Sequence, residues 1–437
     1  MQRWRVKLAQ IVYFQMLALP KNLRLLLFRG DATLQPMATK TTQLQTLPPK
    51  FRVVPLLLLV LTLVTPPACK PLPPPPPVST PTGHAQPTLP SLPQAPSPTT
   101  NSALPPMPQP GEVGAYRADL TPDQLARAEE GRAEFLREYT AETGLGPHFN
   151  DRACANCHNL PVLGGSSDMA HAARIYMTPP DAVHGYERYT LPGYSDLELP
   201  EGAPVAMHRP PSLLGIGLFE TIPDDVLRAG CDTEDKNHDG IHGRNNRSFD
   251  NRPGKFGWKA HTSTIHDFAA DAFAGEMGVT NAVQRDPDHV RDLDTLKDPE
   301  VDSVLVDRVE AFIKALAPPP RAGNHPPGEK IFMELGCAQC HRPETAPGIF
   351  AFSDLCLHDL GPAFDDKIVD IIAQPSEWRS APLWGLRFRH AYFHDERTRD
   401  LAAAILMHGG EAKKVAARFA KLPPEDVRNL LTFLSTL

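Results

Sequence analysis

A five-residue signature occurs twice in this chain and constrains its fold more than any other feature. Residues 154–158 read Cys-Ala-Asn-Cys-His, and residues 337–341 read Cys-Ala-Gln-Cys-His. The pattern C-x-x-C-H is typical of c-type haem attachment, in which both cysteines form thioethers and the histidine binds the iron. We therefore predict two covalently bound haem c groups. The predicted attachment residues are Cys154, Cys157, Cys337 and Cys340, and the predicted iron ligands are His158 and His341.

A shared pattern upstream of each motif supports this interpretation. Gly131-x-x-x-Phe135 precedes the first motif and Gly328-x-x-x-Phe332 precedes the second. A helix with a close-approach glycine followed by a core aromatic residue is how small cytochrome c domains begin. The alternative, a zinc site, would need paired C-x-x-C or C-x-x-C…H-x-x-x-H sets. We predict a mostly α fold with two cytochrome c-like haem domains and long loops.

The predicted domain order follows from shifts in composition along the 437 residues. Many of the 49 prolines cluster before the first motif, where a Pro-, Ser- and Thr-rich stretch cannot bury a core and forms a tether. The predicted parts are a signal or leader region at 1–68, a Pro-rich linker at 69–112, a first haem domain with a loop-rich insertion at 113–322, and a second haem domain at 323–437.

The leader has the pattern of a secretory signal. Lys50-Phe-Arg52 is followed by an apolar run from Pro55 to Val64 and then by Ala68-Cys69. We expect a periplasmic or otherwise extracytoplasmic protein. Two outcomes stay open at Cys69: lipidation, which would tether the protein to a membrane as a lipoprotein, and simple cleavage.

Two of the seven cysteines, Cys231 and Cys356, remain after haem attachment and Cys69 are accounted for. They either pair as a disulfide in an oxidising compartment or stay as buried thiols.

The charge balance bears on the partners. The whole chain has a net charge of −7, but residues 1–68 hold nine basic residues and one acidic residue. Without them 35 basic and 50 acidic residues remain, a net charge of −15. This charge argues against nucleic acid and favours a redox partner protein with a basic docking face.

Helices are predicted where caps and periodicity agree. Thr121-Pro122 begins a helix expected to reach about Tyr139, with Leu125, Ala128, Phe135 and Leu136 on one side. Residues 261–285 and 298–317 have helical periodicity, and a last helix starts near Pro423. Residues 160–260 are predicted to form long loops.

The second axial ligand of each iron decides its chemistry, because a haem with two strong ligands transfers electrons whereas an open one binds peroxide or oxygen. For the second haem we prefer His408 over Met407. For the first haem we choose His171. Its competitors are Met169, Met207, His208 and His266.

Other residues are candidates for the haem environment. Arg379 suits a haem propionate, because its guanidinium matches a carboxylate. His358-Asp359 and His394-Asp395 are neighbour pairs that either fix a tautomer or lie exposed in loops. The tryptophans either pack in the core or relay electrons between haems; they are Trp258, Trp378 and Trp384.

Residues 235–241 resemble the start of a calcium loop. Asp235, Asn237 and Asp239 supply oxygens at positions one, three and five, Gly240 stands at position six, and the Ile241 carbonyl follows. Position twelve is Asn246 rather than glutamate. The loop either binds calcium or is an Asx-rich turn that binds nothing.

Several segments together resemble the di-haem oxidoreductase family of peroxidase-like proteins, related to bacterial di-haem cytochrome c peroxidases. The resemblance covers roughly residues 144–437. It rests on Gly144-Leu-Gly-Pro-His-Phe-Asn150, Gly215–Pro223, Asp239–Arg244, Phe256–Ala260, Phe352–Gly361, Glu377–Gly385 and His408–Ala412.

The resemblance implies an electron relay at one haem and reduction of peroxide or another small oxidant at the other. It also implies that His408 is the distal ligand of the second haem. One departure concerns His394-Asp-Glu-Arg-Thr398, where Glu396 replaces the glycine usual in the family. The alternative function is pure electron transfer with both haems six-coordinate.

Overall fold

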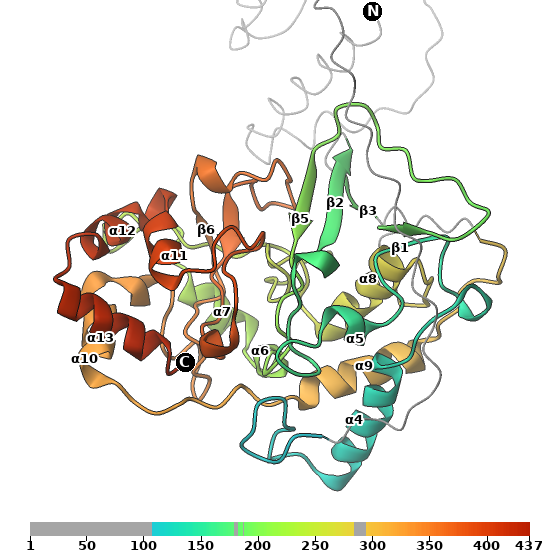
Figure 1. The fold of residues 1–437 in the computed structure, drawn as a ribbon, viewed down its shortest axis with the longest axis horizontal. Coiled ribbons are helices and arrows are strands. Elements are labelled where there is room, and N and C mark those ends of the chain that lie inside the picture. Colours follow the sequence, from blue (N-terminus) through green and yellow to red (C-terminus); the bar gives the residue numbers. More distant parts are fainter. Residues whose placement is uncertain (1–106, 179–181, 187, 284–293) are drawn as a thin grey trace, which may run out of the picture. The chain divides into compact units, whose positions relative to one another are not determined.

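The computed structural model describes residues 107–178, 182–186, 188–283 and 294–437 (Figure 1). The predicted leader at 1–68, most of the linker at 69–112 and the lipidation of Cys69 lie outside these residues. The described residues all belong to one compact unit.

Helix exceeds strand in the described part of the chain. The α-helices are α4 (Pro122–Phe135), α5 (Cys154–Cys157), α6 (Gly217–Glu220), α7 (Asp224–Gly230), α8 (Ile265–Met277), α9 (Ser303–Ala315), α10 (Pro326–Leu335), α11 (Leu401–Met407), α12 (Lys413–Phe419) and α13 (Pro424–Leu434). The strands are β1 (His148–Phe149), β2 (Ala173–Thr178), β3 (Ala182–Tyr186), β4 (Tyr189–Thr190), β5 (Val205–His208), β6 (Leu357–Asp359) and β7 (Glu377–Arg379).

Helix α4 begins as the sequence predicted. The Thr121 side chain accepts a hydrogen bond from the Gln124 backbone, the Gln124 side chain accepts one from the Thr121 backbone, and Pro122 fills the first turn. The helix ends at Phe135, short of the predicted Tyr139. Of the residues predicted to share one side of this helix, Ala128 and Phe135 are buried, whereas Leu125 is 43% exposed.

The two Gly-x-x-x-Phe patterns make the same kind of helix crossing. A Cβ on Gly131 of α4 would lie 1.8 Å from the carbonyl oxygen of Arg308 in α9, and Phe135 packs on Phe312. A Cβ on Gly328 of α10 would lie 2.1 Å from the carbonyl oxygen of Asn429 in α13. Phe332 of α10 makes a ring contact with Phe433 of α13 at this crossing.

Two hydrophobic clusters lie behind these crossings. The larger one includes α4, α8 and α9, and the smaller one includes α10 and α13. Trp384, far along the chain, joins the larger cluster by stacking on Phe219. The larger cluster also includes Ala346, Ile349, Ala351 and Leu355 from beyond residue 322, and the predicted division into two haem domains stays a prediction.

The segment 160–260 contains more regular structure than predicted. Strands β3, β2 and β5 form an antiparallel sheet in that order (Figure 1), with Ile175 opposite Gly185 on one side and Ala206 on the other. The prediction of loops was wrong there, because strand pairing depends on neighbours that a short local pattern does not reveal.

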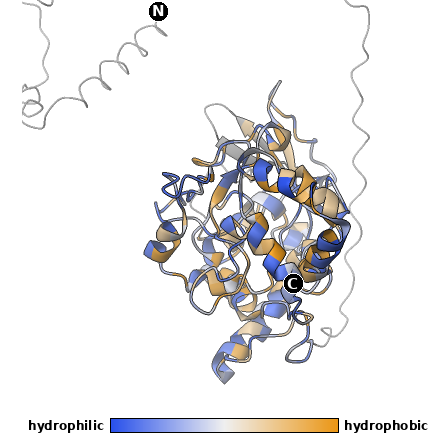
Figure 2. Cartoon of the chain, turned by 90° about the vertical axis from the view of Figure 1, so that its left-hand side faces the viewer, coloured by the Kyte–Doolittle hydropathy of each residue, from blue (hydrophilic) through white to orange (hydrophobic). Residues whose placement is uncertain are grey.

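Three further helices match their predicted segments, since α8 lies within 261–285, α9 within 298–317, and α13 starts at Pro424. Figure 2 shows that the helices carry both hydrophobic and hydrophilic stretches. Among the described residues, no helix is both long and apolar enough to cross a bilayer.

A disulfide joins Cys231 at the end of α7 to Cys356, across 125 residues of sequence. Of the two alternatives for these cysteines, the structure has the paired one. The bond ties the segment after α7 to the strand β6 that follows the second C-x-x-C-H motif.

Candidate functional site

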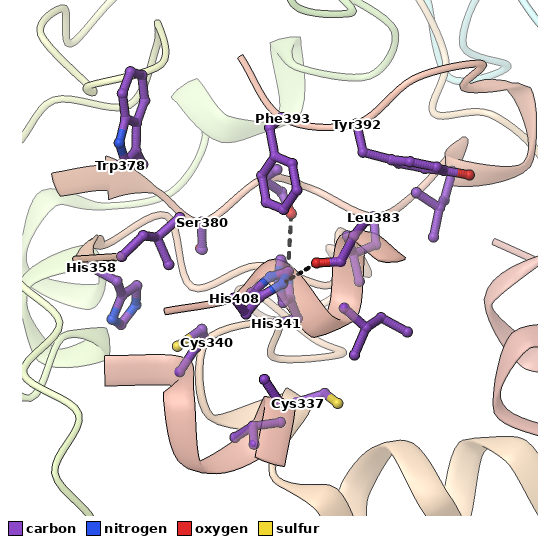
Figure 3. Close-up of a pocket in the computed structure, with 18 of the residues that line it drawn as sticks. Cys337, Cys340, His341, His358, Trp378, Ser380, Leu383, Tyr392, Phe393 and His408 are labelled. Atoms are coloured by element: carbon purple, nitrogen blue, oxygen red, sulfur yellow. Dashed lines mark hydrogen bonds between the residues drawn. The ribbon is translucent and has the colours of Figure 1, made fainter. Parts of the chain in front are cut away.

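The second C-x-x-C-H motif opens onto a cavity, which we call cavity 1 (Figure 3). Helix α10 stops at Gly336, whose φ of 91° reverses the chain, and the short 3-10 helix η4 (Cys337–Gln339) follows. Cys337, Cys340 and His341 line cavity 1, and neither cysteine is in a disulfide. The remaining wall is largely apolar and includes Phe332, Leu383, Leu386, Leu401, Ile405 and Leu430.

His408 faces His341 in cavity 1. Helix α11 begins at the N-cap Asp400 and ends at Met407, which leaves His408 at its C-cap. The two ring centroids lie 6.4 Å apart. An ion held between two opposed imidazoles by metal–nitrogen bonds of about 2 Å would separate the centroids by about 6.3 Å. Met407, the competing ligand, is 41% exposed and does not line cavity 1.

Hydrogen bonds fix the orientation of both rings. His341 Nδ1 lies 3.2 Å from the Phe352 carbonyl oxygen and 3.1 Å from that of Ala381, and His408 Nδ1 lies 2.8 Å from that of Ala404. An Nδ1–H that donates to a carbonyl leaves Nε2 unprotonated, which is the form that binds a metal.

Burial keeps both imidazoles neutral. It lowers the pKa of His341 to about 4, with a further lowering from His408, and it also lowers the pKa of His408. The opposed neutral imidazoles, the two free thiols and the apolar wall together fit a haem c.

The first motif has a related local structure. Its cysteines lie on α5, and His158 follows as the C-cap residue. The Nδ1 atom of His158 lies 3.1 Å from the Gly165 carbonyl oxygen, and burial lowers the pKa of His158 to about 4. Burial raises the pKa of the Cys157 thiol, and the positive charge of Arg188 partly offsets this rise. The Nε atom of Arg188 is buried and has no hydrogen-bond partner among the described residues. A buried guanidinium with an unused donor fits an anionic group such as a haem propionate.

The candidates for the sixth ligand of the first haem are dispersed. His171 lies at the surface between Asp168 and Asp151. His208 bonds Asp366 and packs on Trp378, and His266 bonds Asp307 on α9. Met169 lies in the 3-10 helix η2 (Met169–His171), and Met207 is in β5. The structure records no contact of any of them with His158 in the described residues, so this ligand stays a prediction.

The three residues predicted for the haem environment lie in different places. Arg379 and His394 line cavity 1, where His394 stacks on Trp378 with centroids 3.7 Å apart. Burial and the nearby His208 lower the pKa of His394 to about 3. Trp384 lines a neighbouring cavity instead and stacks on Phe219.

His358 has partners that the sequence did not indicate. Its Nε2 lies 3.0 Å from Asp354 Oδ2 and its Nδ1 lies 2.9 Å from Glu411 Oε2. Asp354 and Glu411, rather than the predicted neighbour Asp359, orient the His358 ring. Glu411 could have been found from the His-Gly-Gly-Glu-Ala motif, but its pairing with His358 could not.

The candidate calcium loop is an ordered turn. Asp235 Oδ1 accepts hydrogen bonds from the Asp239 and Gly240 backbone, and Asp239 Oδ2 accepts one from Gln339 of the second motif. Asn246, at position twelve, is buried and bonded to the Lys259 and Asp370 carbonyls. The loop therefore lacks a closing ligand at that position, and calcium binding stays a prediction.

Comparisons with known proteins identify a family. The model of the family described as "Di-haem oxidoreductase, putative peroxidase" matches residues 203–437, more than half of the chain. The match includes the second motif and starts later than the resemblance predicted from residue 144. No curated protein matches.

Solved structures give distant likenesses. A crystal structure of a MauG-like protein associated with microbial copper homeostasis is 14% identical, with a TM-score of 0.39, covering 78% of this chain and 95% of that one. Hydrazine synthase from Kuenenia stuttgartiensis, pressurised with xenon, is 15% identical, with a TM-score of 0.25, covering 56% and 97%. The assignment rests on the family match.

Proposed function

Because this chain belongs to the di-haem oxidoreductase family, we propose that it is a c-type oxidoreductase that relays electrons at its second haem and reduces a small oxidant at its first. Cys154 and Cys157 would attach one haem and Cys337 and Cys340 the other. His158 and His341 would be the proximal ligands.

The observation that carries this proposal is the opposition of His341 and His408 across cavity 1. A haem with two imidazole ligands is closed to substrates and serves electron transfer. If the second haem is closed, the oxidant site falls to the first. A haem bound there would pass on two electrons from the redox partner, and with two protons these reduce hydrogen peroxide to two waters.

Backbone carbonyls and apolar side chains around cavity 1 would position the second haem and its two imidazoles. The carbonyl groups of Phe352, Ala381 and Ala404 fix the two imidazoles, and the apolar wall of cavity 1 excludes water. Arg379 would bind a haem propionate, and His394 and Trp378 form one wall. These hydrogen bonds would hold both imidazoles in position around a haem bound there.

Electron paramagnetic resonance of the haem-loaded protein tests the proposal. In the oxidised and half-reduced states we expect one low-spin signal that ignores peroxide and one high-spin signal that peroxide alters. Two low-spin signals that persist in both states would instead favour the alternative, a pure electron-transfer protein.

Location and partners are further proposals from the sequence. We place the protein outside the cytoplasm, with its signal at 1–68 and with Cys69 as a membrane tether, and the Cys231–Cys356 disulfide supports an oxidising compartment. Its redox partner would present a basic face to this acidic chain. Globomycin, which blocks lipoprotein processing, should cause a precursor to accumulate if Cys69 is lipidated.

Calcium is a separate proposal for the loop at Asp235, Asn237, Asp239 and Ile241. Its ligands would be three side-chain oxygens and the Ile241 carbonyl. A calorimetric calcium titration of the haem-loaded protein and of its Asp235→Ala variant tests it. Binding by the parent and not by the variant is expected, and an absence of heat in both refutes it.

A further inference from the structure

A second cavity, of about 290 Å³, shares a wall with cavity 1. Arg379, Arg389, Trp258 and Ala381 line both cavities, and the Ala381 carbonyl is the one that lies beside His341 Nδ1. Arg209 adds a third guanidinium group from the segment after β5. We name this second space the arginine cavity, after Arg209, Arg379 and Arg389.

These three guanidinium groups have many unused donors. Together they carry fifteen N–H groups, since each arginine has five. The described residues give them four side-chain hydrogen bonds: Arg379 to the Gly257 and Ser380 carbonyls, Arg389 to the Pro382 carbonyl, and Arg209 to Glu396. Arg209 is only 6% exposed, and its buried Nε atom has no hydrogen-bond partner among the described residues.

Positive charge in the arginine cavity exceeds the negative charge of its walls. Arg399 and His390 also line it, and its carboxylates are Asp168 and Glu396. Asp168 is engaged by His171, and Glu396 lies 3.5 Å from Arg209. Burial, followed by repulsion from Arg209 and Arg379, lowers the pKa of Arg389 to about 10. Arg209 is buried and Arg379 and Arg389 are half-buried, and positive charge held away from solvent in this way is unfavourable unless an anion neutralises it.

The rest of the wall suits an anion that carries an organic body. Trp258, Trp384 and Phe388 supply aromatic surface, and Pro161, Pro211 and Pro319 supply aliphatic surface. Guanidinium groups bind carboxylates through paired, charge-assisted hydrogen bonds. The apolar surface would contact the carbon atoms of such a ligand.

We propose that the arginine cavity is a carboxylate-binding site beside the second haem cavity. The bound carboxylate would be either a propionate of the second haem or a free small carboxylate that enters the cavity. The propionate source rests on the proposed function, since it requires a haem at Cys337 and Cys340. The free source does not, because it needs only the cavity.

Two measurements on the full-length haem-loaded protein separate the sources. The first is a calorimetric titration with succinate, with succinamide as the uncharged control. The second is the reduction potential of the low-spin haem, measured by spectroelectrochemistry. Both are applied to the parent, to Arg389→Gln and Arg209→Gln, to Glu396→Gln, and to the control Arg387→Gln. Arg387 neighbours the cavity segment in sequence but does not line the cavity.

If the carboxylate is free, succinate binds saturably, and binding weakens at least tenfold in Arg389→Gln and Arg209→Gln. If it is a propionate, succinate gives no saturable heat, and the same variants lower the reduction potential. Loss of one positive charge near the haem should shift the reduction equilibrium about tenfold, or about 59 mV. Arg387→Gln should match the parent in both measurements.

Glu396→Gln provides a test of opposite sign. Removing this carboxylate frees Arg209, so succinate should bind more tightly, or the reduction potential should rise. If the arginine variants fail to fold, Glu396→Gln alone tests the carboxylate-binding site. Parent-like behaviour of all three cavity variants in both measurements overturns the carboxylate site. A preparation that carries no haem at the second motif would contradict the proposed function. The succinate titration would still test whether a free carboxylate binds in the arginine cavity.

Discussion

The imidazoles of His341 and His408 oppose one another across cavity 1, with their centroids 6.4 Å apart and their Nδ1 atoms facing backbone carbonyls. One ring follows the second C-x-x-C-H motif and the other ends α11. Two elements distant in sequence therefore bring two imidazoles into opposition, as the proposed six-coordinate haem would require.

Replacing His408 by alanine should open the second haem. We expect the low-spin signal to give way to a high-spin one in electron paramagnetic resonance, because the iron loses its sixth ligand. Met407→Leu is the matched control, since the exposed Met407 side chain does not line cavity 1. A low-spin signal that survives in His408→Ala would mean that another residue is the ligand.

Gly328→Ala should destabilise the protein, because the new Cβ would lie 2.1 Å from the Asn429 carbonyl oxygen. Overpacking at a rigid backbone contact costs about 3 kcal/mol. This cost outweighs the gain of about 1 kcal/mol from replacing a helical glycine by alanine. Urea unfolding of the haem-loaded protein measures the difference, and Gly131→Ala in α4 should behave in the same way.

Gly230→Ala is the control for these glycine variants. Its Cβ would meet only the end of the Arg342 side chain, at 3.4 Å, so its stability should stay within about 1 kcal/mol of the parent. Equal stabilities of Gly328→Ala and Gly230→Ala would contradict the close crossing of α10 and α13.

His358 should make stability depend on pH. Burial alone would lower its pKa, but its hydrogen bonds, with Asp354 and Glu411 among the partners, outweigh burial and raise the pKa well above 6.5. Only a doubly protonated imidazole can donate to both carboxylates. Its contribution to the free energy of unfolding is therefore complete below pH 6.5 and declines as the pH rises toward the raised folded pKa.

Urea unfolding at pH 6 and pH 9 measures this effect. His358→Gln should be less stable than the parent at pH 6, and the gap should narrow at pH 9. A gap that widens with pH would show that His358 is neutral in the folded protein.

Glu396 combines a strained backbone with an ion pair. It stands where the family usually has glycine, and its φ of 52° is left-handed. Its carboxylate lies 3.5 Å from the Arg209 guanidinium. Glu396→Gln removes the carboxylate and keeps the strain, whereas Glu396→Gly removes both. We expect the glycine variant to be more stable than the glutamine variant by about 1 kcal/mol in thermal unfolding, because glycine adopts positive φ without steric cost. The reverse order would contradict a strained turn.

The outcome for Glu396 shows how a departure from a family pattern is resolved. The sequence marked the position as unusual for a tight turn. The structure keeps the turn and pairs the new side chain with Arg209, which lies far away along the chain. No local pattern could have named that partner.

The sequence alone determined the features that depend on neighbours in the chain. The two C-x-x-C-H motifs, the capping of α4 by Thr121 and Pro122, and the Gly-x-x-x-Phe spacing that marked Gly131 and Gly328 as close-approach positions follow from local sequence. Tertiary structure decided which side chains meet across the fold. The opposition of His341 and His408, the seating of His358 between two carboxylates, and the clustering of arginines beside cavity 1 each join residues from separate segments. Such contacts depend on how helices and loops pack, and packing is set by the whole hydrophobic core rather than by any local stretch of sequence.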